Sequence, residues 1–245
     1  MSTIKLITLN IEGDKHLDLI KPFLIKENPD VICLQELFET DFNYLKQYLK
    51  MDGLFAPLVN INAPNKIGLS PRGNFGVAIL SQHQISTPYQ GYYEKHQTAV
   101  PYFDDRDPNC LDRILLAVKV TKDDINYQIA TTHFTYSEKG KATKFQHQSL
   151  NRLFRILDRV GECVLTGDFN APRGNEIHTR LIKRFTDNTP PRTITTLDKN
   201  IHRIKTIPDF VVDYIFTSKD YLAKNVKVVN HVSDHMAVVA NINRI

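Results

Sequence analysis

Residues 165–176 read LTGDFNAPRGNE, and in this stretch a strand-like run, residues 162–166, passes directly into Gly-Asp-Phe-Asn and then into a loop containing proline and glycine. On an extended chain, residues two apart face the same side, so Asp168 and Asn170 can act together on one small target. By itself, however, the stretch favours an ordinary turn, because Gly, Asp and Asn are common in turns for backbone reasons alone. The choice between a turn and a functional site therefore depends on the rest of the chain.

Length and composition predict one large α/β domain, since the chain has 245 residues of which 42% are hydrophobic. No apolar segment reaches the length of a membrane span, and the N-terminal MSTIKLITLN predicts a first strand rather than a signal peptide. The three cysteines, Cys33, Cys110 and Cys163, cannot all pair and form no CxxC motif. We therefore expect a cytoplasmic protein without a structural zinc site. The net charge of +4 is compatible with an anionic substrate.

Apolar periodicity predicts a chain in which helices and strands alternate. Helices are expected at 14–26, with Asp14 as the cap, at 41–49 and at 150–160. Strands are expected at 30–35, 74–80, 111–120, 125–132, 162–166, 211–216, 226–229 and 235–242. Residues 60–72, 82–109 and 186–208 are rich in Pro, Asn, Gly and charge, so we expect long loops there, and such loops often carry specificity.

Polar side chains recur where these apolar runs stop. They are Asn10 in LITLNIEG, Glu36 in VICLQE, His133 in QIATTHF, Asp168 and Asn170 in VLTGDFN, Asp213 in VVDYIF, and Asp234 and His235 in VSDHMAVV. Each has an ordinary explanation of its own, such as a turn cap, an edge charge or a surface histidine. In antiparallel neighbours, however, the start of one strand lies at the same edge as the end of the next. One shared site at that edge is a better account than six separate explanations.

Three of these groups are hard oxygen donors. Glu36, Asp234 and the amide oxygen of Asn10 suit Mg²⁺ or Mn²⁺ and are poorly suited to zinc. A cation held by so few protein ligands keeps bound waters and leaves room for phosphate oxygens. The sequence therefore indicates a divalent-metal site that acts on a phosphate.

The remaining groups suit attack of water on a phosphate ester. Asp168 can orient or deprotonate the water, and Asn170 can hold it or donate to a phosphate oxygen. His235 can stabilise the developing negative charge, with Asp213 fixing its tautomer. His133 can serve as a second cationic donor. Together with the metal, these are the parts required for metal-assisted hydrolysis.

At these residues the sequence resembles the endonuclease/exonuclease/phosphatase superfamily. The matching motifs occur in family order and span residues 4–243. They are LN at 9–10, QE at 35–36, GN-x-G at 73–76, TTHF at 131–134, GDFN at 167–170, DYIF at 213–216 and SDH at 233–235. GDFN or SDH alone is a weak signal, but the ordered set is highly specific.

The resemblance implies an α/β fold, a four-layer α/β/β/α sandwich of two packed mixed β-sheets flanked by helices, with residues 1–245 as a single catalytic domain. The resemblance implies that Asn10 and Glu36 belong to the metal site and that Asp234 is an acid linked to the metal or to water. It implies that Asp168 and Asn170 activate the nucleophile. Asp213 and His235 would form a hydrogen-bonded dyad, and His133 would be the phosphate-binding histidine. Asn74 in the GN-x-G motif is expected to orient His133 by a hydrogen bond. Arg113 at the start of a strand is expected to reach phosphate, with a structural or solvated arginine as the alternative.

The branch of the superfamily is indicated only in part. His133 resembles the DNase, phosphatase, sphingomyelinase and tyrosyl-phosphodiesterase branches, whereas abasic-site endonucleases carry a tyrosine at this place. The chain has no tryptophan, so branches with a tryptophan wall beside the substrate are not matched on that feature.

We therefore expect a Mg²⁺- or Mn²⁺-dependent phosphoesterase that cleaves phosphodiester bonds of nucleic acid, and that acts as a monomer. Phosphatase, phospholipid or tyrosyl-DNA phosphodiesterase activity is the alternative within the superfamily. A catalytically inactive binding module is the alternative from a different class, and the complete set of carboxylates and histidines argues against it.

Two of the expected loops favour nucleic acid, because bases stack on aromatic rings and phosphates bind Lys and Arg. The first loop, 82–109, carries Tyr89, Tyr92, Tyr93, His96, Tyr102 and Phe103, and the second, 186–208, carries Arg192, Lys199, His202, Arg203 and Lys205, with Arg184 just before it. Among these, Arg192 and Arg203 are the predicted substrate contacts. Ordinary loop solvation, with the tyrosines packing the loops down, is the alternative.

Overall fold

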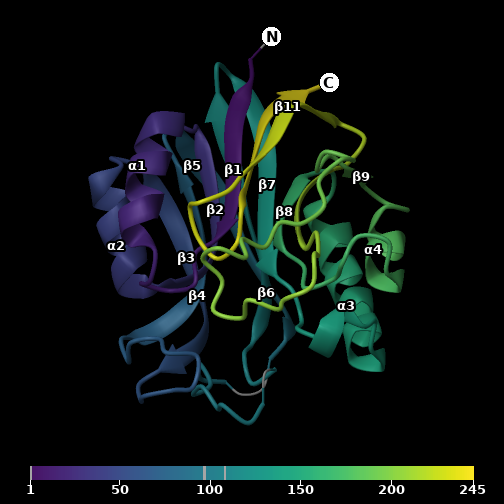
Figure 1. Ribbon diagram of the computed structural model, residues 1–245. Coiled ribbons are helices and arrows are strands. Elements are labelled where there is room, and N and C mark those ends of the chain that lie inside the picture. Colours follow the sequence, from purple (N-terminus) through teal and green to yellow (C-terminus); the bar gives the residue numbers. More distant parts are fainter. Residues whose placement is uncertain (1, 96–97, 108) are drawn as a thin grey trace.

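Two mixed β-sheets of six strands each lie face to face in the computed structural model, which describes residues 2–95, 98–107 and 109–245 (Figure 1). The first sheet has the order β11 (Tyr221–Val229), β12 (Ala237–Arg244), β1 (Ile4–Asn10), β2 (Val31–Phe38), β4 (Gly73–Ser81) and β3 (Asp52–Ile61). The second has the order β5 (Gln84–Glu94), β6 (Arg113–Lys122), β7 (Ile125–His133), β8 (Val164–Asp168), β10 (Asp213–Thr217) and β9 (Thr186–Asp187). Each sheet combines one parallel pair, β1 with β2 or β7 with β8, with antiparallel neighbours.

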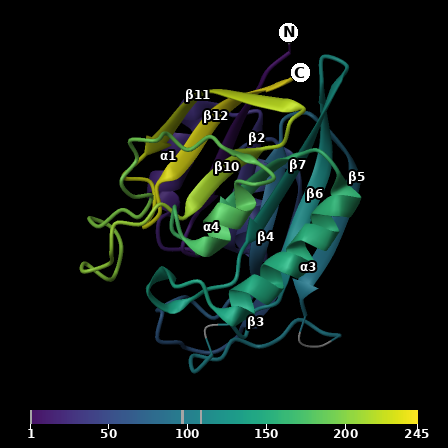
Figure 2. The same cartoon turned by 90° about the vertical axis from the view of Figure 1, so that its right-hand side faces the viewer.

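Helices cover the outer face of each sheet. The first sheet carries α1 (Leu17–Glu27) and α2 (Glu39–Tyr48), and the second carries α3 (Lys144–Val160) and α4 (Glu176–Leu181) (Figures 1 and 2). A short 3₁₀ turn, Glu138–Gly140, precedes α3. The arrangement is a four-layer α/β/β/α sandwich, which confirms the fold class expected from the sequence. Within the described ranges, no helix combines the length and apolar character needed to cross a bilayer.

The strand sequences fit burial on both faces. In β6, Ile114, Leu116 and Val118 point into the core between the sheets, whereas Leu115 and Ala117 point toward α3. Successive side chains of a strand face opposite sides, so a continuous apolar run fills two layers of core at once. A third apolar layer joins α1 and α2 to the outer face of the first sheet.

The arrangement of the strands brings several chain segments to one edge of the sandwich. Strand β1 ends there at Asn10, which lies opposite Gln35 of the parallel strand β2, and β2 continues to Phe38. In the second sheet, β7 and β8 end with His133 opposite Asp168, and the antiparallel β10 begins there with Asp213. The expected convergence at one edge therefore follows directly from the strand register.

Several sequence-based expectations for the elements are wrong. Residues 82–109 are not one loop, since β5 occupies 84–94 as an edge strand whose exposed polar residues and Pro88 hide the apolar pattern. Strand β3 and helix α4 were not predicted, and β3 takes the start of the expected loop 60–72. Asp14 does not cap α1; the helix begins at Leu17 after His16, and the Asp14 carboxylate accepts a hydrogen bond from Ser70 instead.

Candidate active site

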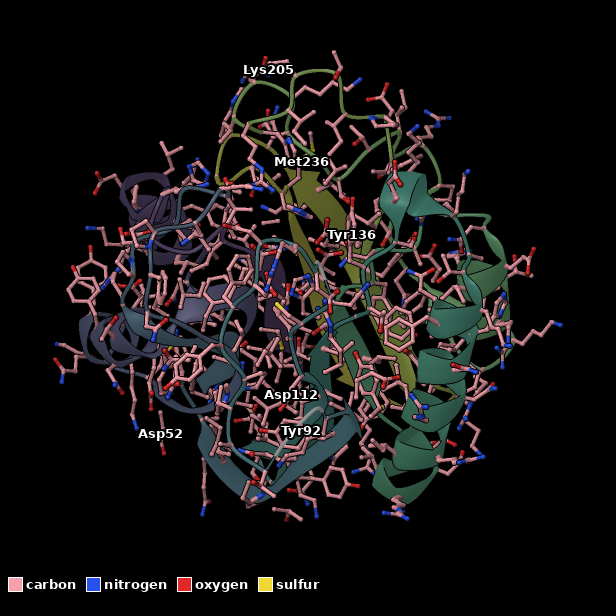
Figure 3. All side chains as sticks on the ribbon, turned by 90° about the horizontal axis from the view of Figure 1, so that it is seen from below. Asp52, Tyr92, Asp112, Tyr136, Lys205 and Met236 are labelled. Carbon is pink, nitrogen blue, oxygen red and sulfur yellow. The ribbon has the colours of Figure 1, made fainter. Side chains whose placement is uncertain are left out.

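A cavity of about 600 Å³ opens at the edge where these strand ends meet. Six of the predicted catalytic and metal residues line it, namely Glu36, His133, Asp168, Asn170, Asp234 and His235. Figure 3 looks onto this end of the molecule, with Tyr136 and Met236 near the middle and Lys205 on a loop at the margin. Tyr136 lines the cavity, and Met236 directly follows the catalytic candidate His235.

The Asp168 carboxylate lies at the centre of the site and receives hydrogen bonds from both sides. Asn10 Nδ2 donates to Asp168 Oδ2 at 3.1 Å, which links the first sheet to the second. The backbone N–H of Asn170 donates to Asp168 Oδ1 at 2.8 Å. Burial raises the pKa of Asp168 to about 6, and the neighbouring Asp213 carboxylate acts in the same direction. The carboxylate is thus fixed in place and is a stronger base than an ordinary aspartate.

The stretch GDFN turns out to be a turn and part of the cavity wall at once. The strand ends at Asp168, and Asn170 adopts a left-handed conformation with φ of 47°. The reason given from the sequence for the two side chains sharing a side, an extended chain, is therefore wrong. The Asn170 side chain donates to the Phe134 carbonyl at 3.0 Å and still lines the cavity. The turn is the means by which Asn170 reaches the site.

Gly167 allows β7 and β8 to approach closely beside Asp168. Its φ of +137° is one that residues with side chains rarely adopt, and an added Cβ would lie 1.9 Å from the Thr132 carbonyl oxygen. The close approach places His133 directly opposite Asp168 in the parallel register.

Glu36 reaches the cavity from a β-bulge. The pairing of β2 with β4 shifts register between Gln35 and Leu37, and Glu36 has a φ of 57°. Such bulges redirect a side chain that the regular pleat would point elsewhere. Burial and the negative charge of Asp234 raise the pKa of Glu36 to about 7, although hydrogen bonding from Asn10 opposes the rise.

Asp213 and His235 form the predicted dyad. His235 Nδ1 lies 2.9 Å from Asp213 Oδ2, and His235 Nε2 lies 3.9 Å from Asp168 Oδ2. Burial alone would lower the pKa of His235, but the carboxylates of Asp213 and Asp168 outweigh it and raise this pKa well above the ordinary value. His235 is therefore held as a cation that points toward Asp168.

His133 differs from the expectation of a second cationic donor. Its Nε2 lies 3.5 Å from Asp168 Oδ2 and 3.6 Å from Glu36 Oε1. Burial, together with the positive charges of Arg113 and His235, lowers the pKa of His133 well below the ordinary value. The imidazole is therefore neutral at pH 7 and can donate one N–H without carrying a charge.

The donor chemistry of the site fits a divalent cation. In the part of the chain that the structure describes, three groups of side chains could each hold one: Glu36 with His133 and Asp168, Asp168 with Asp213 and His235, and Glu12 with His16 and Asp234. The predicted ligands Glu36 and Asp234 thus fall into different groups. The amide oxygen of Asn10 accepts the N–H of Glu12 at 3.1 Å, which leaves it one lone pair for a cation.

The structure places the four predicted substrate contacts differently. Arg113 and Arg203 line the cavity, whereas Asn74 and Arg192 are not among its lining residues. Arg113 is buried and donates to the His133 carbonyl at 3.2 Å, while its Nε is a buried donor without a partner among the described residues. The hydrogen bond expected from Asn74 to His133 is wrong, because the Asn74 side chain accepts from Asn60 and donates to Glu39.

The aromatic residues expected at the rim are mostly elsewhere. Tyr89, Tyr92 and Tyr93 belong to β5, and Tyr93 is buried with its hydroxyl 2.8 Å from Thr132 Oγ1. Phe103 lines the cavity, and Tyr102 is not among its lining residues. His96 lies outside the described residues.

Among the cavity residues that were not assigned to the site from the sequence are Glu12, His202 and Lys15. Glu12 hydrogen bonds Lys15 and His16, and its position two residues after Asn10 was the available signal. His202 was taken only as a loop cation, but it is buried and its Nε2 faces Asp234 Oδ2 at 3.8 Å. Lys15 lines the cavity and gave no signal in the sequence, since a lysine before a helix is usually solvated.

Comparison with known proteins adds an independent observation. A sequence model described as the Endonuclease/Exonuclease/phosphatase family matches residues 7–235. No curated protein matches the chain at a significant level.

Solved structures share the fold over the whole chain. One, an endonuclease/exonuclease/phosphatase from Bacteroides vulgatus, is 19% identical with a TM-score of 0.73 and covers 100% of both chains. The human Nocturnin catalytic domain with bound sulfate is 18% identical with a TM-score of 0.73, covering 99% of this chain and 94% of that one. Sphingomyelinase C from Streptomyces griseocarneus is 15% identical with a TM-score of 0.66, covering 99% and 100%. At these identities the likeness shows the fold alone.

Proposed function

Because the chain belongs to the endonuclease/exonuclease/phosphatase family, whose members are metal-dependent phosphoesterases, we propose that it hydrolyses phosphodiester bonds of nucleic acid with Mg²⁺ or Mn²⁺. In this proposal residues 1–245 act as one catalytic domain. The protein works as a monomer in the cytoplasm, in keeping with three cysteines that are all free and buried. The observation that carries the proposal is the Asp168 carboxylate, held by two donors within reach of a charged histidine.

Asp168 is the proposed base for the attacking water. General-base catalysis is most effective when the pKa of the base lies near the working pH, and a pKa of about 6 meets this condition at neutral pH. The donors on both of its oxygens prevent the carboxylate from turning away from the water. Asn170 forms the neighbouring wall of the cavity, where it holds the water beside Asp168.

The two histidines are proposed to stabilise the phosphate during reaction. His235 is cationic because of Asp213, so it donates to the oxygens on which negative charge develops. His133 donates as a neutral imidazole, and the buried Arg113 guanidinium adds a fixed positive charge behind it. Fixed donors in a partly buried site stabilise such charge more strongly than water does.

Asn10, Glu36 and Asp234 would hold the divalent cation. When bound, the cation polarises a phosphate oxygen and neutralises part of its charge. Because its pKa is raised, Glu36 holds its proton more tightly than an ordinary glutamate, so a cation that binds there would displace this proton and its affinity should increase with pH.

A panel of substrates tests the proposal. Single- and double-stranded DNA, RNA, abasic DNA, 5′-tyrosyl DNA, inositol phosphates and sphingomyelin are each incubated with Mg²⁺, with Mn²⁺ and with EDTA. We expect metal-dependent cleavage of at least one nucleic acid, lost in EDTA. Turnover of a phosphomonoester or of sphingomyelin without cleavage of any nucleic acid would contradict the substrate class, and no turnover of any substrate would favour a binding module.

A further inference from the structure

The cavity lining combines two chemically different kinds of side chain. Beside the carboxylates and histidines it contains apolar side chains, and we call six of them the apolar wall: Ile67, Leu69, Phe103, Ile204, Ile207 and Phe210. The apolar wall is assembled from three separate connections: β3 to β4, β5 to β6 and β9 to β10. None of the catalytic steps described above uses these side chains.

The apolar lining residues differ in exposure. Ile204 is 50% exposed, whereas Leu69 and Leu111, which also line the cavity, are buried. Exposed apolar side chains in a concave surface usually mark a site where a ligand binds and covers them. A volume of about 600 Å³ falls within the range of roughly 300–1,000 Å³ that is typical of small-ligand sites.

The loop that carries Ile204 is fixed to the catalytic groups. The N–H of Asp198 donates to the Asp234 carbonyl at 2.7 Å, and Leu197 forms an isolated β-bridge with His235. The loop is closed on itself by the ion pair between Lys199 and Asp209 at 2.8 Å. The apolar wall is therefore held at a defined position relative to the phosphate-binding groups.

Cations and carboxylates both line the cavity. Lys15, Lys139 and Arg203 are among its lining residues, and Lys15 is paired with Glu12 at 2.6 Å and Lys139 with Glu138 at 3.9 Å. Lys15 Nζ and Arg203 Nη1 both donate to the Ile67 carbonyl, at 2.7 and 3.4 Å, which joins two of the loops across the mouth. Among the described residues, Arg203 forms no ion pair that would occupy its charge, so its guanidinium can bind an anionic group.

We propose that the apolar wall is a subsite for one nucleoside of the substrate, next to the phosphate that reacts. This inference rests on the proposed function. A nucleobase is a flat ring whose faces stack on side chains such as Phe103 and Phe210, and whose neighbouring phosphate suits Arg203. An acyl chain also fits apolar side chains, but Arg203, which lines the cavity without an ion-pair partner among the described residues, favours a ligand with a second anionic group.

Three p-nitrophenyl phosphodiesters that share one leaving group test the subsite. Their second ester group is methyl, octyl or the 5′-oxygen of thymidine. In each reaction water adds to phosphorus, the bond to the p-nitrophenyl oxygen breaks, and p-nitrophenolate leaves. For the wild type we expect kcat/KM for the thymidine ester to exceed the methyl ester value by at least about tenfold, which is the lower end of what apolar pocket contacts provide.

Ile204→Ala should lower the ratio of kcat/KM for the thymidine ester to that for the methyl ester by about fivefold to tenfold. Ile194→Ala is the matched control, because Ile194 lies in the same connection, is 75% exposed and is not among the cavity-lining residues. Three results would each overturn the subsite. The first is equal kcat/KM for the thymidine and methyl esters, and the second is a preference for the octyl ester. The third is an equal loss of kcat/KM on the thymidine and methyl esters in Ile204→Ala.

Calorimetry with thymidine 5′-monophosphate separates this inference from the proposed function, because binding requires no turnover. We expect Ile204→Ala to bind more weakly than the wild type and Ile194→Ala to bind equally well. If no ester is hydrolysed but this difference is found, the subsite stands and the proposed function fails. If the wild type does not bind the nucleotide, the subsite fails even when the methyl ester is hydrolysed.

Discussion

At the scale of single residues, the site depends on carboxyl groups kept out of water. Burial raises the pKa of both Glu36 and Asp168, and each has a partner that keeps it in one orientation. Without a cation these buried charges are costly, and under the proposed function Glu36 becomes a metal ligand and Asp168 a base. Substitutions that change charge without changing shape are therefore the most informative.

Glu36→Gln should weaken metal binding and activity together, because an amide is a poorer ligand for a hard dication than a carboxylate. The Mg²⁺ concentration for half-maximal rate should rise by about tenfold or more, in the range found for lost metal-shell interactions. Glu176→Gln on α4 is the matched control, since this side chain is 77% exposed. An unchanged Mg²⁺ requirement in Glu36→Gln would remove Glu36 from the metal site.

Asp168→Asn should slow the chemical step by about 10²–10⁴-fold while substrate binding and the fold are retained, because the water loses its base. His235→Ala should be at least as damaging. The double mutant should be no slower than the worse single mutant if the two residues act as a unit. Single-turnover rates measure this, with Asp158→Asn on the exposed side of α3 as control; a near wild-type rate in either single mutant would refute the assignment.

At the scale of elements, the ends of β7 and β8 determine where the proposed catalytic residues His133 and Asp168 lie. Gly167→Ala would place a Cβ 1.9 Å from the Thr132 carbonyl, so the strands must separate and Asp168 must move. Gly161→Ala also changes a glycine with positive φ, but nothing lies within 4 Å of its added Cβ. The control has no such clash and should cost about 1–3 kcal/mol of unfolding free energy through its backbone conformation alone.

Gly167→Ala should destabilise the protein by clearly more than this control and should lower activity as well. Thermal unfolding and single-turnover rates measure the two effects. Equal stability of the two variants would show that the close approach of β7 and β8 is not required.

Elements with regular apolar patterns could be predicted from the sequence, and elements without them could not. Strand β6 and helix α3 each bury apolar side chains, and these side chains therefore recur in a recognisable pattern along the sequence. Edge strand β5 has solvent on much of its surface, so its residues carry no such pattern. The register of β2 against β4 places Glu36 in a bulge, and a bulge has no signature in composition.

The same difference holds for the candidate site. Asn10, Asp168, Asp213 and His235 were found because each interrupts an apolar run, and the structure brings them together. Asn74 also stands at the start of a strand, but its partners come from elements distant in sequence. Hydrogen-bond partners that are distant in sequence depend on tertiary packing, and so does a cavity lined by three loops. No local sequence pattern indicates either of them.

At the scale of the whole molecule, the acidic site should make stability depend on pH and metal. The pKa of Glu36 is about 7 in the folded state and 4.5 in the ordinary, unfolded state. Between these two pH values the folded protein therefore keeps a proton on Glu36 that the unfolded protein has lost. In EDTA, the contribution of Glu36 to stability is therefore present below about pH 4.5 and is lost as pH rises through about 7.

Relative to Glu36→Gln, the wild type should lose no more than about 3 kcal/mol of unfolding free energy across this range in EDTA. Denaturant unfolding of both proteins at pH 4.5, 6 and 8 measures the difference. Mg²⁺ should restore the wild type at pH 8 and have a smaller effect on Glu36→Gln. A difference that stays constant with pH would contradict the raised pKa.

Substrate affinity should depend on salt mainly through the cations at the cavity mouth. Arg203 lines the cavity and the exposed Arg192 does not, so Arg203→Ala should flatten the plot of log Kd against log salt more than Arg192→Ala does. The expected change is about one unit of slope for Arg203→Ala, measured with single-stranded DNA. Equal slopes for the two variants would place the phosphate contacts elsewhere on the surface.

The pairing of β1 with β12 has a consequence for the timing of activity during protein synthesis. The ribosome makes Asn10 long before Asp234 and His235, which follow strands β1 to β11 in the chain. Until β12 is available, one edge of β1 lacks its partner and the cavity lacks a wall. A nascent chain that lacks β12 therefore carries an incomplete site, and under the proposed function no hydrolysis is expected before β12 has joined the sheet.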